Sequence, residues 1–149
     1  MDIILRAFIA GATAALVYLT INWAFFLAGV LPFTLTHYTA RLVMPPGTPL
    51  TVLPLVMGTM ADIAASLSAV VAIDLIIRWS GRGYAWLKGL SAGGVLWVIH
   101  VAFIPAMAPR VYSTIPPVMV LASFILSILW GLIAALVLRH LPEPQSQQG

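Results

Sequence analysis

The residues best suited to chemistry are polar side chains that interrupt long apolar stretches, namely Asp62, His100, Asn22, Ser123 and Ser127. An Asp and a His at the same depth of a bundle can share a proton, form an ion pair or bind a polar ligand, because each offsets the other's desolvation. An Asp at the centre of a membrane helix costs roughly 2.5–3.5 kcal/mol on insertion scales, so it normally faces the bundle interior and has a partner.

The spacing of these residues from nearby cations predicts that they lie in one layer. With a helical rise of 1.5 Å per residue, Asp62 lies about 24 Å from Arg78, and His100 lies about 18 Å from Lys88. The other three residues lie about 18 to 24 Å from the cations that flank their own helices. We therefore predict that Asp62 and His100 touch, directly or through one water, and that the other three complete the polar layer.

Three interpretations of this layer remain open. The layer is a cluster of polar groups that hydrogen-bond to one another and fix the register of the helices, or it is a site that binds a proton or a ligand. The third interpretation is a metal or haem site. A haem with two histidine ligands needs them at matching depth, and His37 and His140 lie near opposite ends of the bundle. Only a dimer that pairs His100 with its copy would supply them, so we expect no cofactor and no metal.

The elements that must position these residues are membrane-spanning helices. Of the residues, 62% are hydrophobic and only 7% are charged, whereas a soluble domain carries roughly a quarter charged residues. A bilayer core of ~30 Å needs about 20 mostly apolar helical residues. We predict an all-α bundle of four transmembrane helices in a single domain over residues 1–141, with helices at about 7–31, 52–77, 89–109 and 115–138.

The connections are polar or rich in glycine and proline. The loop over residues 32–51 has room for a short interfacial helix near residues 34–44, which serves as a spacer or as a lid that gates a ligand. Residues 142–149 form a polar tail that we predict to be disordered. Asp74 lies one helical turn before Arg78, which predicts an ion pair near the membrane surface.

Small residues predict where the helices pack closely, because packing in lipid depends on close approach of backbones. The last helix has small side chains at every fourth position, and the third helix has two glycines at the same spacing. Their positions are Ser123, Ser127, Gly131 and Ala135 on the last helix, and Gly89 and Gly93 on the third.

The sequence favours a non-enzymatic role. It contains no cysteine, so disulfides, thiolate metal sites and cysteine redox relays are excluded. It has no glycine-rich phosphate loop, no HExxH motif and no cluster of basic residues that would bind nucleic acid. We predict a multi-pass membrane protein that acts as a small assembly or subunit-like component in the lipid bilayer, as a homo-oligomer or with other membrane subunits. The alternative is a small transporter or proton-coupled carrier that uses Asp62 and His100.

Several scattered features resemble a family of small bacterial inner-membrane proteins with four spans, grouped around YagU. They are a first helix rich in Gly and Ala, Gly58 before Asp62, the segment Tyr-Ala-Trp-Leu-Lys-Gly over residues 84–89, and Trp97 with His100 before Pro105. The resemblance implies a location in the bacterial cytoplasmic membrane. It implies no activity and assigns no functional residue.

The distribution of cations predicts the topology. Most of the seven Lys and Arg residues fall on one side of a four-span arrangement, and cations concentrate in cytoplasmic loops. Both termini are therefore expected in the cytoplasm. Single cysteines in Gly47→Cys and Gly81→Cys should react with an impermeant reagent from opposite sides of the membrane, and labelling of the Gly81→Cys variant from outside would overturn this topology.

Overall fold

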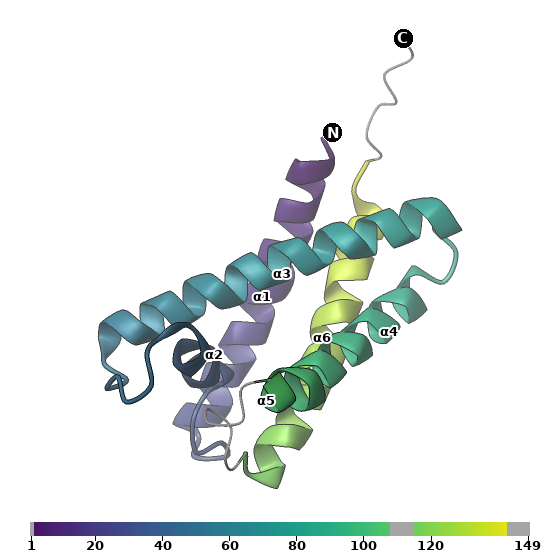
Figure 1. The fold of residues 1–149 in the computed structure, drawn as a ribbon. Coiled ribbons are helices and arrows are strands. Elements are labelled where there is room, and N and C mark those ends of the chain that lie inside the picture. The colour runs from purple at the N-terminus through teal and green to yellow at the C-terminus, as the bar shows by residue number, and fades with distance from the viewer. Residues whose placement is uncertain (1, 108–114, 143–149) are drawn as a thin grey trace.

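The computed structural model describes residues 2–107 and 115–142, and every regular element in these ranges is helical. This confirms the predicted all-α fold class. A bend after the third long helix is made by one turn of π-helix, η1, and a short helix follows it (Figure 1). The elements are α1 (Ile3–Leu27), α2 (Leu35–Val43), α3 (Val52–Ser80), α4 (Ala85–Val98), η1 (Ile99–Phe103), α5 (Ile104–Met107) and α6 (Pro117–His140).

Four of the helical segments are long and apolar enough to cross a membrane, as predicted: α1, α3, the continuous segment Ala85–Met107, and α6. With 29 residues, α3 is about 43 Å long, which exceeds the ~30 Å of a bilayer core. A span of that length is accommodated by tilting. Figure 1 shows α3 strongly inclined to α1 and α6. The direction in which the chain crosses a membrane stays a prediction.

The start of α3 at Val52 agrees with the prediction, and the other helix ends differ from the predicted ones by up to four residues, for local reasons. Helix α1 begins at Ile3 because the Asp2 side chain accepts the Ile4 N–H (3.3 Å) and caps the first turn. It ends before Gly29, whose φ of 72° stops the helix. Pro117 occupies the first turn of α6, as its missing N–H permits. The predicted end of the third span at Pro109 and the tail after Pro142 lie outside the described residues.

Helices α4 and α6 are in backbone contact at the positions that the small residues predict. A Cβ added to Gly89 would overlap the Gly131 carbonyl oxygen and lie 2.6 Å from the Ala135 Cβ. A Cβ added to Gly93 would overlap the Ser127 carbonyl oxygen. Only glycine permits this approach, so the two helices form a rigid pair.

The buried apolar core joins α1, α3 and α6, with Ala85 of α4, at the end of the bundle where α1 begins and α6 ends. Its side chains are all alanines on α1, whereas α3 and α6 also supply larger ones. They include Ala10 and Ala14 on α1, Val70 and Ile77 on α3, and Trp130 and Leu138 on α6.

The short helix α2 lies where the sequence predicts one, and it packs on α3. A Cβ on Gly58 would lie 2.7 Å from the Thr36 carbonyl oxygen, so α2 sits directly on the α3 backbone. At its start, the Thr34 side chain accepts the His37 N–H, and Nδ1 of His37 accepts the Thr34 N–H, both at 3.3 Å. Burial and the nearby Arg41 lower the pKa of His37, which keeps its ring available as an acceptor.

The contact between α4 and α6 predicts unequal effects on stability for two Gly→Ala changes. In Gly131→Ala the new methyl would overlap the Gly89 carbonyl oxygen, so we expect a loss of about 1–3 kcal/mol, typical of overpacking. In Gly94→Ala the methyl would meet only the Ile128 Cδ1 at 3.7 Å, so stability should be unchanged or raised. Thermal unfolding in mild detergent measures both. Equal midpoints for the two variants would mean that α4 and α6 do not pack in this way.

Candidate functional site

The carboxylate of Asp62 is held by two hydroxyl groups from α2. The Thr39 hydroxyl donates to Oδ1 at 2.5 Å, and the Thr36 hydroxyl donates to Oδ2 at 3.1 Å. Thr36 is fully buried, and Thr39 is one helical turn further along the same face. Both partners of Asp62 are therefore neutral donors from a segment outside the four spans.

His100 lies in the π-helical turn, and its ring is oriented by its own helix. Nδ1 is 2.8 Å from the carbonyl oxygen of Leu96, which can only accept a hydrogen bond. Nδ1 is therefore the ring nitrogen that carries hydrogen. In the neutral ring Nε2 is then an acceptor. Within residues 2–107 and 115–142, no hydrogen bond to Nε2 is formed.

The π-helical turn leaves one carbonyl for another helix to bind. The Ile104 N–H bonds to the Ile99 carbonyl, one residue further back than in an α-helix. Pro105 has no N–H and cannot supply the next bond in that register. The hydroxyl of Tyr38 on α2 instead donates to the His100 carbonyl at 2.7 Å. Helix α2 is thus tied to both α3 and η1.

Asp62 and His100 face a shared cavity without bonding to each other. No direct hydrogen bond or ion pair joins them in the part of the chain that the structure describes, so the predicted direct contact is not formed. The two threonines occupy the carboxylate because α2 packs against α3 at that level. A link through one water remains a prediction.

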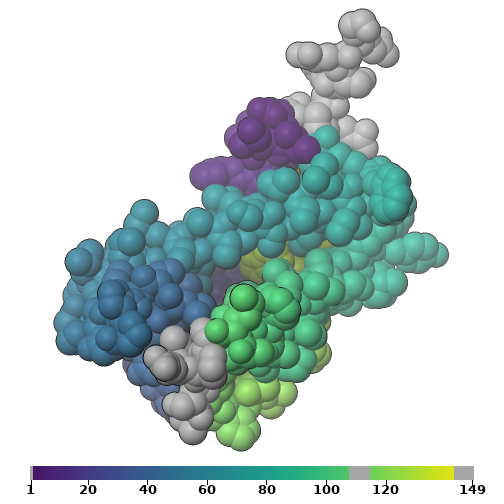
Figure 2. Space-filling model, viewed as in Figure 1, coloured from purple at the N-terminus to yellow at the C-terminus, as the bar shows by residue number. Residues whose placement is uncertain are grey.

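The cavity has a volume of about 110 Å³ and lies among α1, α2, α3, the segment from α4 to η1, and α6. Figure 2 shows a hollow between α3 and the α4–α5 segment, with atoms of α1 and α6 at its floor. Besides Asp62 and His100, its polar or aromatic lining residues include Tyr18, Tyr38, Ser66, Ser123, Ser127 and Trp130.

The remaining residues of the predicted layer divide between this cavity and other roles. Ser123 and Ser127 line it, but the Ser123 hydroxyl donates to Val120 O (2.8 Å) and accepts the Trp97 indole N–H (3.2 Å). Asn22 does not line it. Its Oδ1 accepts the Leu35 N–H (3.2 Å), so it caps the first turn of α2. Asn22 therefore positions α2, the segment that binds Asp62.

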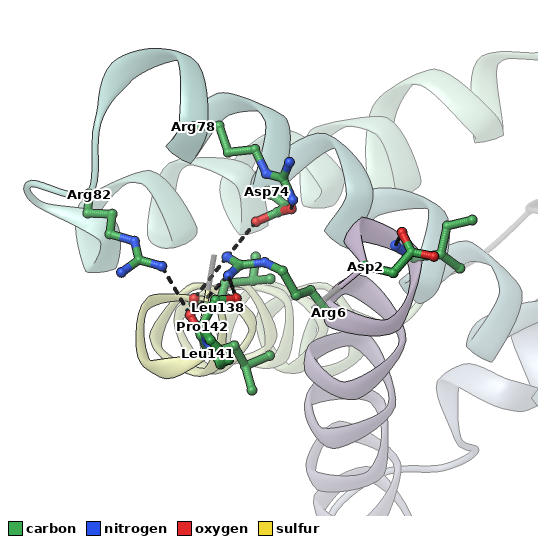
Figure 3. Close-up of polar contacts among 9 residues, drawn as sticks. Asp2, Arg6, Asp74, Arg78, Arg82, Leu138, Leu141 and Pro142 are labelled. Carbon is green, nitrogen blue, oxygen red and sulfur yellow. Dashed lines mark hydrogen bonds and ion pairs between the residues drawn. The ribbon is translucent and has the colours of Figure 1, made fainter. Parts of the chain in front are cut away.

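A second buried polar cluster lies where α1 begins and α6 ends (Figure 3). It includes Arg6, which the sequence analysis counted only among the cations that set the topology. The predicted pair is present, with Arg78 Nη2 2.7 Å from Asp74 Oδ2. In addition, the buried Arg6 donates to Asp74 Oδ1 at 2.9 Å. It also donates to the carbonyls of Leu141 (2.9 Å), Leu138 (3.2 Å) and Pro142, which end α6.

Sequence reasoning missed the donors of Asp62 and the buried position of Arg6. A weak signal for the donors was available, because Thr36 and Thr39 lie on one face of a short helix next to the second span. Among the described side chains, no three His, Cys, Asp or Glu residues lie close enough to hold a metal ion.

Comparisons with known proteins place no further constraint on the site. The chain matches no protein-family model, no curated protein and no solved structure. The resemblance to the YagU group therefore stays a prediction, and the candidate site depends on its own geometry.

The geometry at Asp62 predicts unequal effects for two Thr→Val changes. Thr39→Val removes a donor to a carboxylate, and such bonds are worth about 1.5–3 kcal/mol. Thr13→Val removes only an exposed bond to the carbonyl of its own helix, so its effect should be small. Unfolding of both variants in the same detergent measures the difference. A Thr39→Val variant as stable as Thr13→Val would show that α2 does not hold the carboxylate.

Proposed function

We propose that this chain is a multi-pass membrane protein that binds a small molecule in its intramembrane cavity and acts as a small carrier. The single observation that supports this proposal is the cavity of about 110 Å³, with Asp62 and His100 in its wall. A cavity of that size accommodates several waters or a small organic group. Ionisable residues inside spans are costly, and they mark substrate, ion or proton pathways.

The polar groups of the cavity are arranged for recognition as well as for packing. Helix α2 holds the Asp62 carboxylate and also the carbonyl of His100 through Tyr38, so the two walls of the cavity are linked by one short helix. A π-helical turn within an otherwise α-helical span is frequently found at functional sites. These features favour a binding site over a cluster that only fixes register.

A subunit-like role in a larger assembly is the second candidate, and the exposure of α4 favours it. Only 6% of the most apolar stretch of its span is buried, compared with 33% for α1 and for α6. In this role the free face of α4 would meet another copy or another membrane protein. For either candidate, we propose the bacterial cytoplasmic membrane as the location, on the basis of the cation distribution and the resemblance.

The carrier proposal predicts that a small molecule stays bound during gentle purification. Native mass spectrometry from mild detergent should find an adduct on the wild-type chain. Ala69→Leu adds bulk at the cavity wall and should remove the adduct. Ala72→Leu, an exposed position on the same helix, is the matched control and should retain it.

Two results would count against the carrier proposal. An adduct that survives in Ala69→Leu would not occupy the cavity. A wild-type chain that carries no small molecule but copurifies as a defined oligomer or with a defined partner subunit would favour the second candidate.

A further inference from the structure

We infer that the ligand of the cavity is a small organic cation with at least one N–H group, such as a primary ammonium attached to an apolar body, held between Asp62 and His100. This inference rests on the proposed binding function and specifies its ligand. It follows from the charges, the direction of the hydrogen bonds and the apolar walls of the site.

Among the described residues Asp62 forms no ion pair, whereas Asp74 forms two. Asp74 is fully buried and forms ion pairs with Arg6 (2.9 Å) and Arg78 (2.7 Å). The described hydrogen bonds to Asp62 come only from Thr36 and Thr39, and no Lys or Arg lines the cavity among the described residues. A carboxylate removed from water without a counter-charge is costly, so a cationic ligand would be stabilised there.

Asp62 and His100, the two ionisable groups on either side of the ligand, both offer acceptors. Since Nδ1 of His100 donates to the Leu96 carbonyl, the neutral ring offers Nε2 as an acceptor. The Asp62 oxygens are acceptors as well. A ligand that meets both groups must donate hydrogen, which an ammonium does and a carboxylate or phosphate does not.

The rest of the wall suits an apolar body attached to the cation. Tyr18, Tyr38 and Trp130 line the cavity, and the faces of aromatic rings attract cations. The other lining residues are mostly aliphatic, including Leu19, Leu96, Met119 and Ile115. A small amphiphilic amine fits this combination better than an inorganic cation, which would need several oxygen ligands.

The position of the hollow indicates where such a ligand enters. Helices α3 and α4 lie close at the turn that joins them and diverge away from it (Figure 1), and the hollow opens between them (Figure 2). Both helices belong to segments long and apolar enough to span a membrane, so in a bilayer this opening would face lipid. Amphiphilic amines partition into bilayers and would reach Asp62 from the side.

Binding of three probes of similar size and different charge tests the inference. The full chain in phosphatidylcholine nanodiscs is titrated at neutral pH with benzylamine (a cation), benzyl alcohol (neutral) and benzoate (an anion), with empty nanodiscs as the blank. We expect benzylamine to bind at least about tenfold more tightly than benzyl alcohol, as a charge-assisted hydrogen bond implies, and benzoate not to bind.

Two Asp→Asn variants assign the effect to the cavity. Asp62→Asn retains the shape of the side chain and removes its charge, so its affinity for benzylamine should fall to that for benzyl alcohol. Asp2→Asn makes the same change at the exposed cap of α1, where Asn is an equally good cap, and should bind benzylamine as the wild type does.

The possible failures are distinguishable from one another. Equal binding of benzylamine and benzyl alcohol by the wild type would overturn the cationic ligand and leave a cavity that binds neutral molecules. Preferred binding of benzoate would indicate that a protonated His100 sets the charge of the site. No binding of any probe above the blank would count against both the cationic ligand and the proposed binding function. All three outcomes are measured on the wild-type chain, so none of them depends on whether a variant folds.

Discussion

Two carboxylates inside the spans set the main constraint on this structure, because the protein must replace the water that each loses. Asp74 obtains two guanidinium partners, and Arg6 extends that cluster to the carbonyls at the end of α6. Asp62 obtains two hydroxyl groups and a cavity. The first arrangement balances charge and ties three helices together. The second leaves a charge for a ligand to balance.

The remaining contacts support this division. The glycines of α4 and α6 bring two backbones together and form a rigid pair, while the core of α1, α3 and α6 lies at the Asp74 end. Because α3 is long and inclined, it diverges from α4 beyond their turn (Figure 1). Helix α2 packs on α3 at Gly58, where α4 is no longer close. Its threonines donate to Asp62 in place of groups from α4. The cavity is therefore a consequence of how the helices are paired.

The sequence predicted the features that depend on composition and helical spacing. The four spans and the small residues between α4 and α6 follow from hydropathy and from a period of four residues. Asp62 and His100, which the sequence analysis expected at one depth, both line the cavity. Depth along a helix does not specify the direction in which a side chain points around the helix axis. The prediction that Asp62 and His100 are in direct contact was therefore wrong. The donors of Asp62 come from α2, in the connection between two spans, and Arg6 was counted only among the cations that set the topology. Neither contact could be predicted, because no local pattern shows which helices meet.

Infrared difference spectroscopy of the full chain, with aspartate labelled with ¹³C at its carboxyl group, tests most directly whether Asp62 is the charge left for a ligand. Spectra recorded with and without an amphiphilic ammonium ion, and compared with those of Asp62→Asn, separate the band of Asp62 from that of Asp74. The account predicts that the Asp62 band shifts when the cation is added, while the Asp74 band stays unchanged because Arg6 and Arg78 already balance its charge. A constant Asp62 band, or a shift confined to Asp74, would contradict it.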